Sequence, residues 1–280
     1  MATLCILDFD GTMTDAEQEG APFRQGYLED VAVLTGLSTD EVMRRAERLE
    51  AEVAADPDRH GWIFNGQIVA PATVDPYLRM MPVARRIFDE LGCFMAEAER
   101  TRLLDGILYK YNYQKTAVAF RPGARDALLA LRAAEVYIVT NSHTDAVVNK
   151  LRVLDAEGLA WLTERVYGRA RKYVLDDSFT AVPAELRLPG LDRPVLLRRR
   201  AYHEVLDALR QKAGVEWSDV LVVGDIFELD LALPLALGAR VALVVNAFTP
   251  AYERAYVDAH PRGCLVQQLS ALPGLISQVT

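Results

Sequence analysis

The residues with the clearest chemical potential lie near the start of the chain, in Asp8-Phe9-Asp10-Gly11-Thr12. They follow the short apolar run Leu4-Cys5-Ile6-Leu7, which predicts a buried strand that carries two carboxylates to its carboxyl end. Two carboxylates so close together in apolar surroundings repel each other unless a cation shares them. A metal site explains the pattern, and the simpler alternative is a strand followed by a polar turn, where Asp and Gly are common.

Two later apolar runs end in residues that suit the same chemistry. Thr140 and Asn141 follow one of them, and Asp225 follows the other, with Asp230 five residues further on. Because the carboxyl ends of parallel strands meet at one edge of a sheet, we expect these side chains to converge with Asp8. Any one of them alone could be a helix N-cap, but the whole set indicates a site.

The elements that must position these residues follow an α/β pattern. Apolar strands near 136–139, 165–168, 220–223 and 241–245 alternate with helices, which predicts a doubly wound parallel sheet with right-handed crossovers. The long stretch between the first strand and the others is mainly helical and leaves and returns at the carboxyl end of that strand. We therefore predict a core domain of residues 1–15 and 120–280 and a helical cap, or lid, of residues 16–119.

Two stretches rich in turn residues interrupt this pattern. Residues 56–76 contain three prolines and two glycines and predict a loop or a short extended excursion. Residues 172–197 are also extended and turn-rich, which suggests a hairpin inserted into the core.

The composition is that of an ordinary soluble globular protein, with 51% hydrophobic and 25% charged residues. The formal net charge of −8 argues against a nucleic-acid or anionic-membrane partner. No apolar run approaches the roughly 18 residues that a membrane helix needs, and an acid as early as Asp8 argues against a signal peptide. The three cysteines lie far apart and suggest neither a disulfide nor a zinc site. We expect a cytoplasmic protein.

On its motifs the chain resembles the haloacid dehalogenase (HAD) superfamily of phosphohydrolases. Asp8-x-Asp10-Gly11-Thr12-x-Thr14 is similar to the first motif of that family, Val139-Thr140-Asn141 to the second and Gly224-Asp225-x-x-x-x-Asp230 to the fourth. The resemblance implies a HAD-like, Rossmann-type core with a helical cap inserted after the first motif.

The resemblance also implies how the acids would work. Asp8 would be the nucleophile that attacks phosphorus, and Asp10 would protonate the leaving group and then deprotonate the attacking water. Mg²⁺ would be bound by the carboxylates of Asp8 and Asp225, with the backbone carbonyl of Asp10 as a third ligand.

The other motif residues would support this reaction. Thr140 would donate a hydrogen bond to a phosphoryl oxygen. Asp230 would orient a metal-bound water or the basic group, and Asn141 is expected in a similar supporting position.

The basic residue of the third motif has two candidates. Counting back about 25 residues from Asp225, as the resemblance implies, reaches Arg200, which would offset negative charge on the phosphoryl oxygens. Lys172 is the alternative, because it follows the preceding strand. On spacing we assign Arg200.

The predicted function is that of a Mg²⁺-dependent phosphatase, which hydrolyses a small soluble phosphate monoester through an aspartyl-phosphate on Asp8. Asp10 disfavours carbon–halogen cleavage, because that reaction needs no acid for the leaving group. A phosphomutase of the same family and a catalytically silent member that binds a phosphorylated ligand are the alternatives. A receiver domain shares the acids, but the insertion and the motif spacing count against it. The expected partner is a small-molecule phosphate ester.

Overall fold

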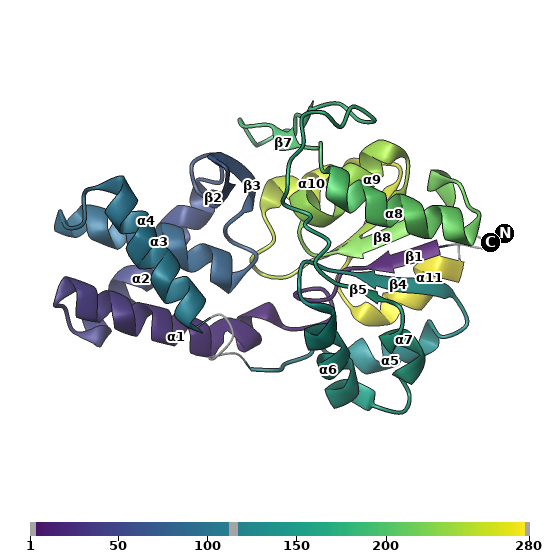
Figure 1. Cartoon of the computed structure of the whole chain (residues 1–280), viewed down its shortest axis with the longest axis horizontal. Coiled ribbons are helices and arrows are strands. Elements are labelled where there is room, and N and C mark those ends of the chain that lie inside the picture. Colours follow the sequence, from purple (N-terminus) through teal and green to yellow (C-terminus); the bar gives the residue numbers. More distant parts are fainter. Residues whose placement is uncertain (1–3, 112–116, 278–280) are drawn as a thin grey trace. The chain divides into compact units, whose positions relative to one another are not determined.

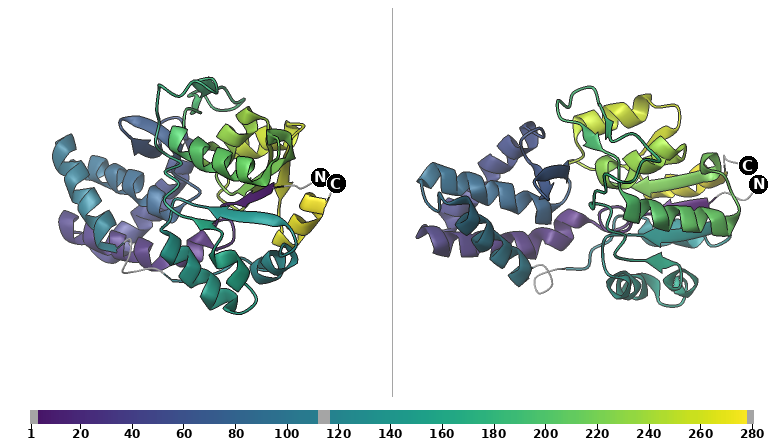
Figure 2. Two further views of the ribbon diagram at one scale, coloured as in Figure 1. Left: turned by 45° about the vertical axis from the view of Figure 1, so that its right-hand side comes forward. Right: turned by 45° about the horizontal axis from the view of Figure 1, so that its top comes forward.

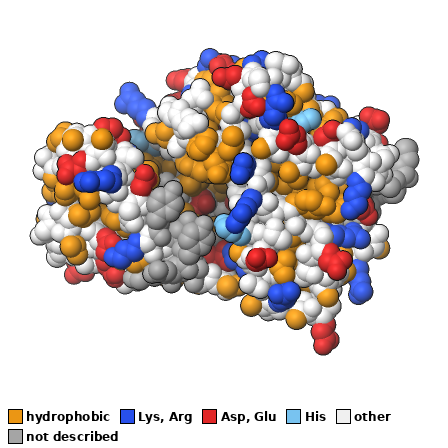
Figure 3. All heavy atoms as spheres, viewed as in Figure 1, with side chains coloured by type: hydrophobic (Ala, Val, Ile, Leu, Met, Phe, Trp, Pro, Cys, Tyr) orange, Lys and Arg blue, Asp and Glu red, His pale blue; other side chains and the backbone are white. Residues whose placement is uncertain are grey.

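The computed structural model describes residues 4–111 and 117–277. The chain divides into two compact units, one formed by Met1–Asp15 and Phe120–Thr280 and the other by Ala16–Ala119. Positions 1–3, 112–116 and 278–280 of the two predicted domains lie outside the described residues. Among the described helices, none is long and apolar enough to cross a lipid bilayer. On the face drawn in Figure 3, acidic and basic side chains are interspersed over both units.

The first unit is built on a six-stranded sheet. Its strands are β1 (Leu4–Leu7), β4 (Glu135–Val139), β5 (Val166–Tyr167), β8 (Val220–Gly224), β9 (Arg240–Val244) and β10 (Gly263–Val266). They lie in the order β10-β9-β8-β1-β4-β5, and all neighbours pair in parallel (Figure 1). The predicted parallel α/β sheet is confirmed. Strand β10 was not predicted, because an edge strand of four residues, three of them only half-buried, gives a weak apolar signal.

Helices cover both faces of this sheet (Figure 2). They are α5 (Ala124–Ala130), α6 (Thr144–Asp155), α7 (Ala160–Thr163), α8 (Arg200–Ala213), α9 (Ala232–Leu237), α10 (Ala251–Ala259) and α11 (Leu272–Ser277). Because side chains alternate along a strand, Leu4 and Ile6 pack in the cluster that contains α8 and α9. Leu7 packs on the other face, in the cluster that contains α5 and α6. The central strand is therefore buried on both sides, and its carboxyl end is held in place.

A segment of the first unit separates Lys172 from α8. It contains the antiparallel pair β6 (Glu185–Leu186) and β7 (Val195–Leu196), in agreement with the predicted hairpin. Its side chains Phe179, Leu188 and Leu191 pack into the core on the α8 face of the sheet. The segment is thus an integral part of this unit.

The second unit is mainly helical. Its elements are α1 (Ala16–Thr35), α2 (Thr39–Ala55), β2 (Gly61–Phe64), β3 (Gln67–Pro71), α3 (Pro76–Leu91) and α4 (Glu97–Tyr111). Ser38 caps α2 by accepting a hydrogen bond of 3.3 Å from the backbone nitrogen of Glu41. The helices share one apolar core of their own. The stretch predicted as a loop or extended excursion contains the antiparallel hairpin β2–β3.

Candidate active site

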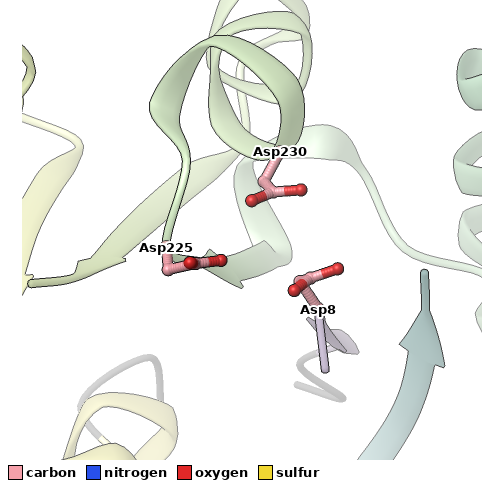
Figure 4. Close-up of side chains that lie close together, drawn as sticks. All are labelled: Asp8, Asp225 and Asp230. Carbon is pink, nitrogen blue, oxygen red and sulfur yellow. The ribbon is translucent and has the colours of Figure 1, made fainter. Parts of the chain in front are cut away.

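Three aspartates meet at the carboxyl edge of the parallel sheet. Asp8 directly follows β1 and Asp225 directly follows β8, the strand beside it. Asp230 comes from a single turn of π-helix, Phe227–Leu231, which follows β8. Figure 4 shows the three carboxylates gathered around one point, and an oxygen of each lies within 4.8 Å of those of the other two. Adjacent parallel strands therefore bring together acids that are more than 200 residues apart in the sequence.

A tight turn after Asp8 lets the backbone pass close to Asp225. Gly11 has φ +80°, a left-handed conformation that favours glycine. A Cβ atom at this position would lie 2.2 Å from Oδ2 of Asp225, so a side chain has no room there. The next residue, Thr12, places its hydroxyl 3.1 Å from Oδ2 of Asp8 and 3.2 Å from Oδ1 of Asp225. The turn thus links two of the acids.

Lys172 is the buried cation of this cluster. Its ammonium donates to Oδ1 of Asp8 at 2.7 Å and to Oδ1 of Asp230 at 2.8 Å, and its side chain is 1% exposed. The backbone nitrogen of Lys172 donates to Oδ1 of Asn141 at 2.8 Å. The second oxygen of Asp230 accepts a hydrogen bond of 3.0 Å from the backbone nitrogen of Ile226. Asn141 and Asp230 therefore hold the lysine beside Asp8.

Burial and charge shift the pKa values of these groups. Burial raises the pKa of Asp8 to about 7, against the opposing effect of the Lys172 ammonium. Burial, followed by the charges of Asp8 and Asp230, raises the pKa of Asp225 well above its ordinary value. Burial alone would lower the pKa of Lys172, but Asp230 and Asp8 raise it overall, so the lysine stays charged at neutral pH. The site therefore holds the charged Lys172 beside two acids, Asp8 and Asp225, whose pKa values are raised.

Asp10 lies outside this cluster of three acids and has a different partner. Its Oδ1 accepts from the ammonium of Lys150, on α6, at 2.6 Å. Its Oδ2 is buried and has no hydrogen-bond partner among the described residues. Lys150 was not anticipated, because a lysine within an amphipathic helix is usually a solvated residue.

Thr140 and Arg121 form hydrogen bonds in the loops that follow the strands. The hydroxyl of Thr140, which is buried, accepts a hydrogen bond of 3.1 Å from the backbone nitrogen of Ser142 and so closes the turn after β4. Arg121 donates to the carbonyl oxygens of Gly11 at 2.7 Å and of Val245 at 3.1 Å. Sequence reasoning missed Arg121; its place two residues after the predicted cap was the available signal.

The structure places Arg200, the residue assigned on spacing, against Asp176 and Ser178, and the alternative, Lys172, against Asp8. The guanidinium of Arg200 donates to Asp176 at 2.6 Å and to Ser178 at 2.8 Å, and its side chain is 43% exposed. Lys172, the alternative, contacts Asp8 directly. The segment 173–199 lengthens the chain between β5 and α8, so a count back from Asp225 ends at the start of α8 instead of at the end of β5.

The donor set suits a hard divalent cation. Asp8, Asp225 and Asp230 are all buried, and when all three are ionised they carry more negative charge than the ammonium of Lys172 can balance. Carboxylate oxygens are the preferred protein ligands of Mg²⁺. A cation at this point would offset both the burial and the repulsion between the acids, which together raise the pKa values of Asp8 and Asp225.

A family model for haloacid dehalogenase-like hydrolases matches residues 2–238. No curated protein matches the sequence. Solved structures share the fold at low identity. One is a conserved haloacid dehalogenase-like protein of unknown function from Agrobacterium tumefaciens, with 14% identity, a TM-score of 0.54 and coverage of 99% of each chain.

Two other solved structures cover almost the whole chain. A predicted phosphoglycolate phosphatase from Haemophilus somnus has 17% identity and a TM-score of 0.54, over 98% of this chain and 97% of its own. A structure from Thermotoga maritima, proposed to be a β-phosphoglucomutase, has 14% identity and a TM-score of 0.51, with both chains fully covered. These similarities show the fold. With the family model over most of its length, the chain belongs to the haloacid dehalogenase-like hydrolases.

Proposed function

We propose that this hydrolase is a Mg²⁺-dependent phosphatase that cleaves a small phosphate monoester through an aspartyl-phosphate on Asp8. The observation that carries the proposal is the contact of 2.7 Å between Asp8 and the buried ammonium of Lys172, with two further acids beside them. A carboxylate at a strand end, paired with a fixed cation, is suited to attack an anionic phosphoryl group.

Lys172 and Thr12 would prepare Asp8 for this attack. The ammonium of Lys172 holds Oδ1 of Asp8, and the hydroxyl of Thr12 lies beside Oδ2. Burial disfavours the charged form of Asp8, and the lysine opposes that effect. The same ammonium is positioned to attract the phosphoryl oxygens as the substrate approaches.

The acids around Asp8 would bind Mg²⁺. The carboxylates of Asp8 and Asp225 and the backbone carbonyl of Asp10 are the proposed ligands, and the carboxylate of Asp230 is a further candidate because one of its oxygens lies within 4.8 Å of those of Asp8 and Asp225. The cation would screen the negative charges of the nucleophile and of the phosphate from each other. Asp230 would also keep Lys172 in place through their hydrogen bond of 2.8 Å.

Asp10 would exchange the proton in both halves of the reaction. In the first half, an oxygen of Asp8 bonds to phosphorus while the ester bond to the leaving group breaks, and Asp10 protonates the departing oxygen. In the second half, Asp10 takes a proton from water as the water oxygen attacks phosphorus and the bond to Asp8 breaks. Thr140 would donate a hydrogen bond to a phosphoryl oxygen.

A phosphatase screen with purified protein and Mg²⁺ tests the proposal. Sugar phosphates, nucleotides, small organic phosphates and an aryl phosphate should include esters from which phosphate is released. Asp8→Asn should abolish release, whereas Asp176→Asn, which removes the partner of Arg200, should retain it. A phosphorylated peptide that contains Asp8, labile to hydroxylamine, should be found by mass spectrometry after rapid quenching. Equal activity of the Asp8→Asn variant would refute the nucleophile, and isomerised ester without phosphate release would indicate a mutase.

A further inference from the structure

The two carboxylate oxygens of Asp10 have different surroundings. Oδ1 accepts a charge-assisted hydrogen bond of 2.6 Å from the ammonium of Lys150. Oδ2 is shielded from solvent and has no hydrogen-bond partner among the described residues. A buried carboxylate oxygen without a partner is unfavourable, so its presence calls for an explanation. One oxygen of Asp10 is therefore anchored and the other is left open.

Lys150 reaches Asp10 from a different element. It lies in the second turn of α6, the helix that follows β4 and Thr140, whereas Asp10 lies just after β1. Strands β1 and β4 are neighbours in the sheet, which brings the two residues together across 140 positions of sequence. The side chain of Lys150 is 21% exposed and that of Asp10 is 30% exposed, so the contact is only partly screened by water.

We propose that Lys150 is a positioning residue that holds Oδ1 of Asp10 and so assigns Oδ2 as the oxygen that exchanges the proton during phosphate-ester hydrolysis. This inference rests on the proposed function. A lysine suits the task because its ammonium is a point charge that engages one oxygen, whereas the planar fork of an arginine would engage both. The open oxygen is thereby kept for the leaving group and for water.

The proton balance follows from this assignment. In the first step, the proton on Oδ2 passes to the ester oxygen as its bond to phosphorus breaks and the bond from Asp8 forms. In the second step, Oδ2 takes a proton from water as the water oxygen bonds to phosphorus and the bond to Asp8 breaks. Lys150 takes no part in this proton transfer; its proposed role is to fix the carboxylate of Asp10.

The kinetic test uses the dependence of the rate on the leaving group. Lys150→Met removes the ammonium and keeps most of the chain length. For an alkyl phosphate, whose leaving group needs a proton, kcat/KM, which reports the first half of the reaction, should fall at least about tenfold. For 4-nitrophenyl phosphate, whose leaving group needs none, kcat/KM should stay within about threefold. Lys212→Met removes an exposed lysine of α8 and is the matched control, with both rates unchanged.

A double-mutant cycle ties the effect to Asp10. In an Asp10→Asn background, Lys150→Met should cause no further loss on the alkyl phosphate, because the group that it positions is already absent. Equal losses of kcat/KM on both esters, or a full additional loss in the Asp10→Asn background, would overturn the proposal.

A crystal structure of the Lys150→Met variant supplies a readout that needs no turnover. The Asp10 carboxylate should be rotated or should occupy more than one conformer, whereas in the wild-type protein it should keep one. An unchanged Asp10 conformer in the variant would refute the role of Lys150. If the wild-type protein cleaves no phosphate ester, the proposed function fails, and the conformation of Asp10 still decides the role of Lys150.

Discussion

Lys172 and Asp8 form a buried ion pair of 2.7 Å although 164 residues separate them in the sequence. Each group loses hydration on burial, and their attraction offsets part of that loss. The pair is shared with Asp230, so the single ammonium lies between two carboxylates. This arrangement forms only in the folded sheet. In it, the ammonium of Lys172 offsets negative charge on both Asp8 and Asp230.

Lys172→Met should destabilise the protein and abolish phosphatase activity. The substitution leaves Asp8 and Asp230 without their cation, and breaking a buried pair in this way costs about 3–5 kcal/mol. Urea unfolding and a phosphatase assay measure the two effects. Because loss of folding would also abolish activity, the phosphatase assay is made under conditions in which circular dichroism shows the variant to be folded.

Arg200→Ala is the comparison that separates the two candidates for the third motif. Its partly exposed pair with Asp176 should contribute at most about 1 kcal/mol to the free energy of unfolding. We expect kcat/KM within about twofold of the wild-type value, since the contacts of Arg200 are with Asp176 and Ser178. A large loss of activity in this variant together with an active Lys172→Met variant would restore Arg200 to the site.

Gly11→Ala should impair both stability and metal binding. The added methyl group would lie 2.2 Å from Oδ2 of Asp225, and the φ of +80° is strained for alanine. The turn must therefore shift, at a cost of more than about 1 kcal/mol, and move Asp225 or Thr12 with it. Thermal unfolding and Mg²⁺ titration by calorimetry test this expectation. Gly36→Ala is the control, because Gly36 also has a positive φ but no atom within 4 Å of the added Cβ.

Stability without divalent cations should fall as pH rises through the range between about 4 and 7. The folded-state pKa of Asp8 is raised to about 7 from 3.8, so the unfolded chain releases this proton first and the folded state binds it more tightly. Added Mg²⁺ must displace that proton, so its stabilising effect should be larger near pH 8 than near pH 5. Thermal unfolding with Mg²⁺ or with a chelator at both pH values measures the difference. An equal effect of Mg²⁺ at the two pH values would contradict a shared site for proton and metal.

Arg193→Met should destabilise the protein more than a surface arginine does. Arg193, from the segment 173–199, pairs with Glu228 at 2.7 Å in the π-helical turn that carries Asp230, and the Glu228 side chain is 1% exposed. Removal of the Arg193 guanidinium leaves the buried carboxylate of Glu228, which lies near Glu253, without its cation. We expect this to lower the free energy of unfolding by about 3–5 kcal/mol. Arg187→Met, whose pair with Glu185 is exposed, should cost at most about 1 kcal/mol. Urea unfolding of the two variants gives the comparison, and equal losses would contradict it.

Local sequence patterns predicted most of the parallel sheet. The runs that form β1, β4, β8 and β9 are mostly apolar. Because these strands are buried on both faces, side chains that point to either face must be apolar. The sequence pattern did not predict β10, because this strand lies at the edge of the sheet and is only partly buried. Burial on both faces leaves a strong local signal, whereas a short edge strand does not.

The acids could be proposed from the sequence because each directly follows an apolar strand or lies shortly after one. Their partners could not, because ion pairs across a sheet depend on which strands become neighbours and on how long the connections are. The spacing rule pointed to Arg200, and the inserted segment 173–199 placed Lys172 beside Asp8 instead. Lys150 gave no signal in the sequence at all. The order of the strands and the insertion decided which cations face which carboxylates, and only the tertiary structure contains that information.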